Sequence, residues 1–411
     1  MSSVSTLNVL LHGALIGTIT HVGADRSLFA FTDDYIADRN RATLSLGFKD
    51  SLGELIADFR PYQTRLMPFF SNLLPEDTLR TYLAARAGVN PEREFFLLWA
   101  LGRDLPGAVV VEPAEGEAQP PVDERIAPTS SDKALRFSLA GVQLKFSAAV
   151  KANGGLTVPV DGAGGSWIVK LPWHLHEGVP ENEYAMMQLA RQIGINVPES
   201  TLLDIHNIEN IPEGLERFGS TAFAIKRFDR SEGGAAVHIE DFAQVFGVYP
   251  HNKYNKASMR NIAEVVGIEG QDQDVMELIR RLVFNVLIGN ADMHLKNWSL
   301  IYHDRRNASL APAYDFVSTI PYIADETLAL RVSRSKRFDE VDMDELRHLA
   351  VKARLPQKMV LDVAQETVAR FNEAWTSEKS HLPLSRHVIE TIDKHLKNLP
   401  IRKSTRSSTK G

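Results

Sequence analysis

The stretch Gly289-Asn290-Ala291-Asp292-Met293-His294-Leu295-Lys296-Asn297 carries the strongest signal in this chain. It places carboxylate, carboxamide, imidazole and ammonium groups directly after the apolar segment 275–288, and a second acidic residue, Asp315, follows further along. Phosphoryl transfer uses such groups: one Asp accepts the proton of the attacking hydroxyl, while an Asn oxygen and another Asp hold Mg²⁺. The pattern therefore predicts a kinase-type site, with Asp292 as proton acceptor and Asn297 and Asp315 as metal ligands.

A simpler interpretation of this stretch is a helix C-cap at Gly289-Asn290 followed by a polar turn. Both residues suit that role, but a cap does not explain why so many polar groups follow and lead into an apolar strand. We expect His294 and Lys296 to brace the loop or to touch phosphate. A zinc site at His294 is not expected, because no partners lie at ligand spacing.

The composition is that of a globular protein with more than one domain or lobe. The chain has 411 residues, of which 44% are hydrophobic and 24% charged. The absence of cysteine excludes disulfides, thiolate metal sites and cysteine nucleophiles. Without a signal segment or a long apolar run, the expected location is the cytoplasm, with no membrane partner.

Charge argues against direct binding of nucleic acid over the whole surface. The net charge is −6, whereas such binding relies on neutralising phosphates with Lys and Arg. The clearest basic cluster is at the end of the chain and comprises Arg402, Lys403, Arg406 and Lys410. We expect this tail to be disordered, with contact to DNA as a side hypothesis.

The order of predicted elements indicates strands first and helices later. Strand patterns are expected within 7–20, with a turn at His12-Gly13, and within 135–150, 156–160, 167–171 and 223–226. Apolar spacing and end signals predict helices over 76–87, 91–101, 181–193, 274–288, 344–353, 357–375 and 385–399. A Pro- and Glu-containing connector falls between residues 113 and 132. A β-rich lobe followed by an α-rich lobe is therefore expected.

Two further positions could meet nucleotide phosphates. Ala140 and Gly141 in the loop 138–145 could let backbone N–H groups approach phosphate, with Lys145 adding charge; a plain hairpin turn is the alternative. Lys170 lies on an apolar strand, where an inward lysine needs an anion; the alternative is a position on the solvent face. Glu183 on the next helix is a candidate counter-charge, by analogy with the lysine–glutamate pair of protein kinases.

Residues 290–297, the loop 138–145 and Phe228-Asp229-Arg230 together resemble the HipA family of bacterial serine/threonine kinases, the toxins of toxin–antitoxin pairs. The resemblance extends over residues 7–399. It implies an α+β, two-lobed protein-kinase-like fold with a small N-terminal α+β subdomain (1–112, with 69–75 as its signature) and a linker (113–133). A β-rich nucleotide lobe (134–230), an all-helical C-terminal lobe (231–400) and the basic disordered tail (401–411) would follow.

The resemblance also implies roles for individual residues. Ser138 would be the autophosphorylation site, whose phosphate holds the loop outward and disables nucleotide binding. The hinge between the lobes would read adenine, although Lys226 stands where an acidic residue is expected. Asp229 and Arg230 are expected to form a structural ion pair, and Gln244 to lie near the site. The residues expected to contact the nucleotide are Ala140, Gly141, Val142, Gln143, Leu144, Lys145, Lys170, Lys226, Arg227, Phe228, His294 and Lys296.

The expected activity is transfer of phosphate from ATP, with Mg²⁺, to a serine or threonine of a protein. Members of the family modify aminoacyl-tRNA synthetases, glutamyl-tRNA synthetase in particular, so the resemblance implies a similar target. It also implies a helix-turn-helix antitoxin of the HipB type as partner, with DNA reached only through that antitoxin. Two alternatives stay open: a nucleotide-binding corepressor without transfer activity, and a kinase acting on small-molecule hydroxyls.

Overall fold

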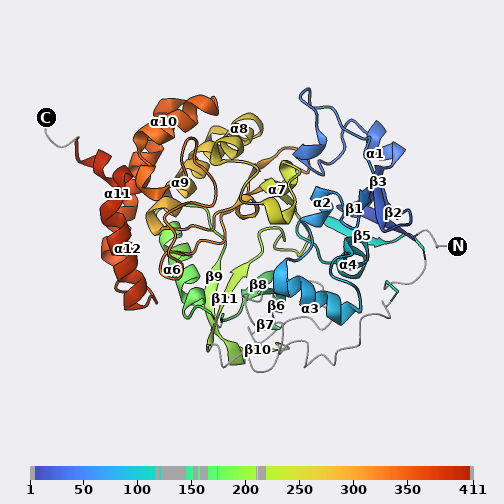
Figure 1. Cartoon of the computed structure of the whole chain (residues 1–411), viewed down its shortest axis with the longest axis horizontal. Helices are drawn as coiled ribbons and strands as arrows, with labels where there is room; N and C mark the ends of the chain where they lie inside the picture. Colours follow the sequence, from blue (N-terminus) through green and yellow to red (C-terminus); the bar gives the residue numbers. More distant parts are fainter. Residues whose placement is uncertain are drawn as a thin grey trace.

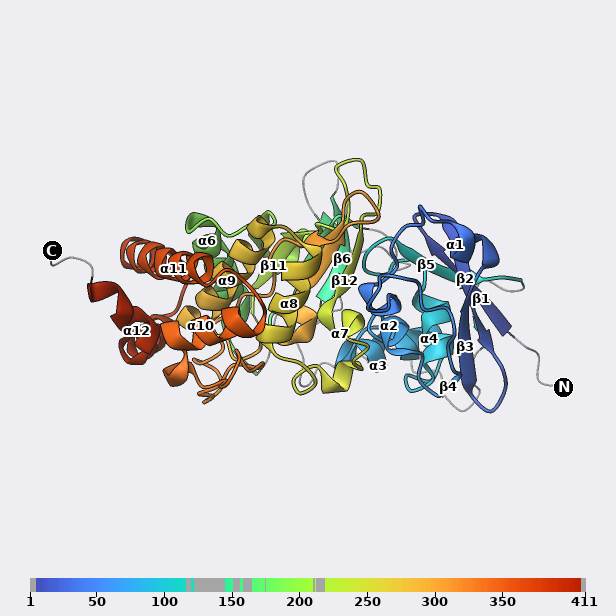
Figure 2. The ribbon, with the colours of Figure 1, turned by 90° about the horizontal axis from the view of Figure 1, so that it is seen from above.

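The computed structural model describes residues 5–115, 120–121, 145–150, 156–157, 165–173, 175–209, 211 and 219–407. An N-terminal domain, a lobe built on a six-stranded sheet and a helical lobe follow one another along the chain (Figure 1). Seen from above, the N-terminal domain and the helical lobe lie at opposite ends of the molecule (Figure 2). This arrangement agrees with the α+β, two-lobed fold expected from the sequence.

The N-terminal domain contains an antiparallel five-stranded sheet in the order β4-β3-β2-β1-β5. His12 and Gly13 both have positive φ, 52° and 80°, which is the turn geometry that matches the twist of a hairpin. The predicted strand–turn–strand is thus confirmed. The strands are β1 (Ser5–Leu11), β2 (Ala14–His21), β3 (Arg26–Phe31), β4 (Tyr62–Gln63) and β5 (Val109–Pro113).

Short helices complete the N-terminal core. Phe69 and Phe70 on α2 are buried against the rings of Phe29 on β3 and Phe48 on η1, so the segment 69–75 does pack a core before a helix. The predicted helices 76–87 and 91–101 are present, the second one beginning at Glu94. The helices are α1 (Asp33–Ala37), η1 (Leu46–Phe48), α2 (Pro68–Ser71), α3 (Asp77–Ala87) and α4 (Glu94–Leu101).

The second sheet has the strand order β10-β7-β6-β8-β11-β9 and is antiparallel except between β10 and β7. Strand β8 is internal, which places Lys170 in the middle of the sheet. One side is covered by α6, whose apolar face packs on β11 and β9 and reaches α11. The elements are β6 (Lys145–Val150), β7 (Leu156–Thr157), β8 (Trp167–Lys170), α6 (Val179–Gln192), β9 (Ser200–Asp204), η2 (Ile205–Asn207), β10 (Ile208–Glu209) and β11 (Thr221–Lys226).

The helical lobe is organised around the buried helix α9, which packs along α11. All four helices predicted after residue 270 are present within a few residues, while α8 was not predicted. The elements are α7 (Phe242–Val245), η4 (Pro250–Asn252), α8 (Met259–Glu269), α9 (Asp272–Ile288), η5 (Leu295–Asn297), η6 (Phe338–Glu340), α10 (Met343–Lys352), α11 (Gln357–Glu378), α12 (Arg386–Asn398) and η7 (Pro400–Ser407).

Two expectations for this lobe need correction. It is not all helical, because β12 (His238–Asp241), β13 (Ser299–Tyr302) and β14 (Ser309–Leu310) form a small antiparallel sheet whose strand β13 follows residues 289–297. The expected disordered tail does not begin at residue 401, since Ile401 is buried in the core and Arg402 donates to the carbonyl of Leu396 at 2.8 Å. Within the described ranges, no helix is long and apolar enough to cross a membrane.

Candidate active site

The end of α9 sets the start of the candidate catalytic loop, residues 289–297, called the catalytic loop below. Gly289 caps the helix with φ 67°, and a Cβ there would lie 2.4 Å from Cδ1 of Ile320, so glycine is required for both backbone and space. The Asn290 N–H donates to the carbonyl of Asn285 at 2.9 Å. The C-cap interpretation is therefore correct for these two residues, and it positions the polar groups that follow.

Local hydrogen bonds then turn the loop so that Asp292 faces solvent. Asn290 Oδ1 accepts from the Asp292 N–H at 3.0 Å, and the Ala291 N–H donates to Thr319 Oγ1 at 2.8 Å. The side chain of Asp292 is exposed, as a group that must meet an acceptor hydroxyl has to be.

Asn297 and Asp315 are in direct contact. Asn297 Nδ2 donates to Asp315 Oδ2 at 2.8 Å, and Asn297 is only 6% exposed. The neighbouring Tyr314 hydroxyl donates to the carbonyl of Lys296 at 2.8 Å, which is a further bond between the two segments. Asp315 has φ 64°, a conformation that a non-glycine residue adopts rarely and that is often found at functional sites.

Lys170 joins the six-stranded sheet to this cluster. Its Nζ donates to Glu183 Oε1 at 2.6 Å and also to Asp315 Oδ1, and its side chain is only 12% exposed. The counter-charge expected at Glu183 is thus in contact with the lysine, and the solvent-face alternative for Lys170 is wrong. Lys145 stands directly opposite Lys170 on β6, so two ammonium groups start from the same face of the sheet.

The charges of this cluster shift one another's pKa values. Although burial raises the pKa of Asp315, the ammonium groups of Lys170 and Lys145 outweigh it and hold that pKa below its ordinary value. Burial lowers the pKa of Lys170, but the carboxylates of Asp315 and Glu183 raise it overall. Burial raises the pKa of Glu183 to about 7 despite its bond to Lys170. Asp315 and Lys170 therefore stay ionised at neutral pH.

Asp292 is bound by a residue that the sequence analysis did not single out. The Tyr254 hydroxyl donates to Asp292 Oδ1 at 2.8 Å, and the Tyr254 ring packs edge-on against His294, with ring centroids 5.1 Å apart. Although Asp292 is exposed, partial desolvation by the surrounding protein raises its pKa overall; the bond from Tyr254 lowers it, and the nearby carboxylate of Asp315 raises it. Tyr254 lies in a polar loop without periodicity, so no sequence pattern pointed to it.

His294 and Lys296 lie differently from a phosphate-binding pair. The buried His294 ring has a lowered pKa of about 3, chiefly because of burial, and is neutral. Lys296 Nζ bonds to the carbonyl of Asn72 at 3.0 Å and to Glu76 Oε1 at 2.9 Å. Lys296 thus contacts the N-terminal domain and braces the loop, which is one of its two expected roles. Its ammonium group is bound by these partners and not directed at a phosphate position.

The hinge residues have partners of their own. Lys226 and Arg227 use their backbone N–H groups to bond the carbonyls of Glu199 and Ser166, each at 2.8 Å, so an adenine base would not be read by these N–H groups. The Arg227 side chain is buried against Asp229, with Nη2 2.8 Å from Oδ2.

Two other expected positions lie around this hinge. The expected ion pair between Asp229 and Arg230 is present at 2.8 Å. The Phe228 ring packs against the ring of Tyr314, the residue before Asp315, with ring centroids 5.6 Å apart.

Gln244 closes the reciprocal cap of α7, and this places it between domains rather than against Asp292. Its N–H bonds Asp241 Oδ1 at 2.8 Å, and its Nε2 donates to the carbonyl of Phe69 at 3.1 Å. Other predicted positions, Ser138 and 140–144, fall outside the described residues.

The oxygen atoms of Asn297 and Asp315 suit a hard cation such as Mg²⁺, but only together with ligands from another molecule. Asn297 Oδ1 is buried and lacks a hydrogen-bond partner among the described residues, and the Asp315 carboxylate is adjacent to it. Oxygen atoms of this kind are what Mg²⁺ prefers. Within the described part of the chain, no group of three His, Asp or Glu could hold a metal by itself. The residues fit an ion that is bound jointly with nucleotide phosphates.

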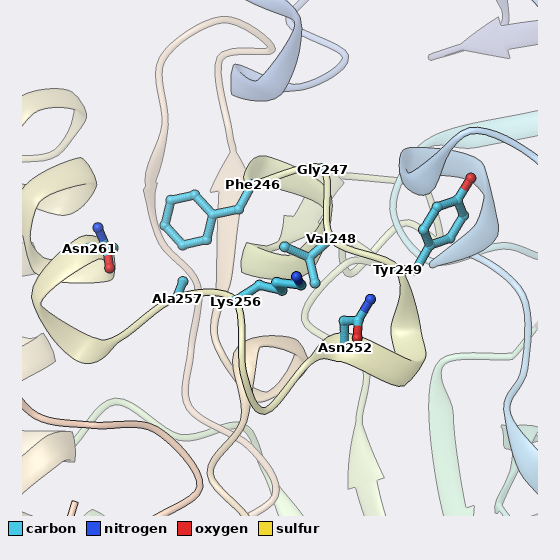
Figure 3. Close-up of a pocket in the computed structure, with 8 residues that line it drawn as sticks. All are labelled: Phe246, Gly247, Val248, Tyr249, Asn252, Lys256, Ala257 and Asn261. Atoms are coloured by element: carbon cyan, nitrogen blue, oxygen red, sulfur yellow. The ribbon is translucent and has the colours of Figure 1, made fainter.

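A pocket of about 390 Å³ lies next to this site, on the segment that carries Tyr254. Figure 3 shows Phe246 and Asn261 on one side of it and Tyr249 and Asn252 on the other. None of the lining residues belongs to the charged cluster or to residues 289–297, so the pocket is not the centre of the candidate site. The lining residues are Phe246, Gly247, Val248, Tyr249, Asn252, Lys256, Ala257 and Asn261.

The two-lobed, protein-kinase-like fold and this arrangement of Lys, Glu, Asn and two Asp residues place the chain in the class of kinase-like proteins. Two family models match the chain: HipA N-terminal domain over residues 7–112 and HipA-like C-terminal domain over residues 137–375. The chain belongs to the HipA family.

Individual relatives agree with this assignment. The Sinorhizobium fredii protein named "Putative kinase Y4dM" is 56% identical, over 96% of this chain and 97% of its own length. The serine/threonine-protein kinase toxin HipA of Shewanella oneidensis is 27% identical over 78% of this chain and 77% of its own. A solved structure of the Shewanella HipA, in complex with HipB and operator DNA, has a TM-score of 0.73 at 22% identity, covers 96% of both chains, and supports the fold.

Proposed function

We propose that this protein is an ATP- and Mg²⁺-dependent serine/threonine protein kinase of the HipA type. The observation that carries the proposal is the continuous chain of contacts from Glu183 through Lys170 and Asp315 to Asn297, with the exposed Asp292 on the same loop. These are the groups that phosphoryl transfer needs for positioning and charge neutralisation.

Asp292 is the proton acceptor in this proposal. The acceptor hydroxyl displaces the hydroxyl of Tyr254 from Asp292 Oδ1 and gives up its proton there as its oxygen attacks the γ-phosphorus of ATP. The bond between that phosphorus and the bridging oxygen breaks, and ADP leaves. Lys170, held by Glu183, and Lys145 opposite it supply positive charge to the phosphates. Mg²⁺, held by Asn297 Oδ1 and the Asp315 carboxylate, would neutralise further charge on the nucleotide.

The test is transfer of label from γ-labelled ATP by the purified full chain in the presence of Mg²⁺. We expect labelling of Ser138 or of an added protein, and loss of labelling in Asp292→Ala and in Asp315→Ala. Asp362→Ala is the matched control, because Asp362 is an exposed residue of α11 that pairs with Lys358 one helical turn away. Retained labelling in either active-site variant would refute the assigned roles.

The acceptor and the partner follow from the family. We propose an aminoacyl-tRNA synthetase as target and a helix-turn-helix antitoxin as the partner through which DNA is reached. The complex of the Shewanella relative with HipB and operator DNA supports the second point, and the net charge of −6 gives no support to direct DNA binding. Comparing phosphopeptides from cells that express the wild type or Asp292→Ala identifies the target. A pull-down with a helix-turn-helix protein of the HipB type tests the partner.

A further inference from the structure

One acidic residue of the N-terminal domain lies between two lysines of the helical lobe. Glu76, the N-cap residue of α3, accepts from Lys296 Nζ at Oε1, 2.9 Å away, and from Lys253 Nζ at Oε2, 2.8 Å away. All three side chains are mostly buried, with exposed fractions of 26%, 15% and 14%. Because each carboxylate oxygen has its own ammonium partner, Glu76 links two segments of the helical lobe at once.

Each lysine leads directly to a residue of the proposed chemistry. Lys296 immediately precedes Asn297 in the catalytic loop. The carbonyl of Lys253 accepts from the Leu295 N–H at 3.3 Å, and the next residue, Tyr254, donates to Asp292. Through Lys296, Glu76 therefore holds the Asn297 side of the loop, and through Lys253 it holds the Asp292 side.

Another residue of the N-terminal domain contacts the same part of the helical lobe. Asn72, one turn earlier in the chain, accepts from Lys296 Nζ with its carbonyl at 3.0 Å and donates from Nδ2 to the carbonyl of Val248 at 2.7 Å. Burial raises the pKa of Glu76, but the two lysines outweigh it and hold that pKa at about 2. The carboxylate is therefore ionised whenever the enzyme works.

We propose that Glu76 is a positioning residue for phosphoryl transfer, holding Asp292 and Asn297 in register with each other through Lys253 and Lys296. The inference rests on the proposed kinase function. In this proposal the N-terminal domain contributes to the active site, because it supplies the Glu76 carboxylate that contacts Lys253 and Lys296. A carboxamide at position 76 would keep the size of the side chain and remove the charge that both lysines contact, while Lys296 would keep Asp241 Oδ2 at 4.0 Å.

The experiment compares Glu76→Gln with the wild type and with Glu92→Gln, which removes an exposed carboxylate from the same domain. In Glu76→Gln we expect kcat to fall at least about tenfold while the dissociation constant for ATP stays within about twofold. Glu92→Gln should match the wild type in both quantities. A kcat within twofold of the wild type, or a loss that merely parallels lost ATP binding, would overturn the proposal.

A second comparison tests the route through the lysines. In a Lys253→Met/Lys296→Met background, adding Glu76→Gln should change kcat less than about twofold, because the partners are already gone. A full additional tenfold loss in that background would show that Glu76 acts by another route.

Hydrogen exchange provides a measurement that does not depend on activity. In Glu76→Gln the amides of residues 291–298 should exchange faster, with those of α11 unchanged; equal exchange in the loop would contradict the proposal. If the wild type transfers no phosphate, the proposed function fails on its own. Faster loop exchange would then still establish the positioning contact.

Discussion

Asn297 and Asp315 are joined by a hydrogen bond of 2.8 Å from Nδ2 to Oδ2. The other end of the same carboxamide, Oδ1 of Asn297, is buried and has no hydrogen-bond partner among the described residues. A buried carbonyl oxygen without a hydrogen bond is costly unless something else satisfies it. The contact thus orients the carboxamide so that its oxygen is available to a cation beside the carboxylate.

This geometry predicts how Asn297→Ala behaves. Loss of the carboxamide removes the oxygen proposed to bind the metal and the hydrogen bond to Asp315 Oδ2, so the Mg²⁺ concentration for half-maximal transfer should rise about tenfold or more. The measurement is the transfer rate across a Mg²⁺ titration at saturating ATP. An unchanged half-saturation point would show that Asn297 does not hold the ion.

Glu183→Gln tests the buried pair with Lys170. Glu183 is 1% exposed, and its loss leaves Lys170 still paired with Asp315. We expect the free energy of unfolding to fall by about 1 to 3 kcal/mol, less than for a fully orphaned charge. Denaturant unfolding measures it. Glu366→Gln, which alters exposed pairs with Arg280 and Arg370, should change stability by less than about 1 kcal/mol. Equal effects would argue against a special role for Glu183.

Tyr254→Phe tests the bond to Asp292, the proposed proton acceptor. The Tyr254 hydroxyl lowers the pKa of Asp292, so its removal raises that pKa. Because Asp292 must be deprotonated to accept a proton, the acidic limb of the pH–rate profile should move to higher pH. Profiles of kcat/KM for the wild type and the variant give the comparison. Coincident acidic limbs, or a shift toward lower pH, would mean that Asp292 is not the group being titrated.

Glu240 predicts a pH dependence of stability. It is 0% exposed, and burial raises its pKa from 4.5 to about 7 despite bonds from Ser45, Leu46 and Tyr302. The folded protein therefore holds this proton more tightly than the unfolded chain does. Its contribution to stability is complete below pH 4.5 and is lost as the pH rises through about 7.

The measurement is urea unfolding at pH 5 and at pH 7.5. The difference in unfolding free energy between the two should be smaller in Glu240→Gln than in the wild type. Glu54→Gln, an exposed change in the N-terminal domain, should keep the wild-type difference. A wild-type difference in Glu240→Gln as well would assign the dependence to other groups.

Much of the fold could be predicted because local patterns were strong. The apolar spacing over 274–288 corresponds to α9, and the Gly289 signal to its C-cap, since both depend on backbone geometry within one element. The pairing of Lys170 with Glu183 was also within reach, because an inward lysine on an apolar strand requires an anion. The short strands β12 and β14 carried too few residues for a pattern to emerge.

Local sequence patterns could not predict which residues contact the catalytic loop. Lys296 was expected at phosphate or as a brace, and its contact with Glu76 joins residues far apart in the chain and in different domains. Tyr254 was missed for the same reason, since its bond to Asp292 depends on how the loop after α7 packs. Neither contact leaves a periodic signal in the sequence.

The sequence by itself determined which segments become helices or strands and which chemical groups follow the buried helix, because backbone preferences and apolar burial act over a few neighbouring residues. Only the tertiary structure decided which charges meet. Ionic contacts require atoms within about 4 Å and are screened by salt beyond about 10 Å. The packing of the N-terminal domain against the helical lobe therefore selects Glu76 as the partner of Lys253 and Lys296.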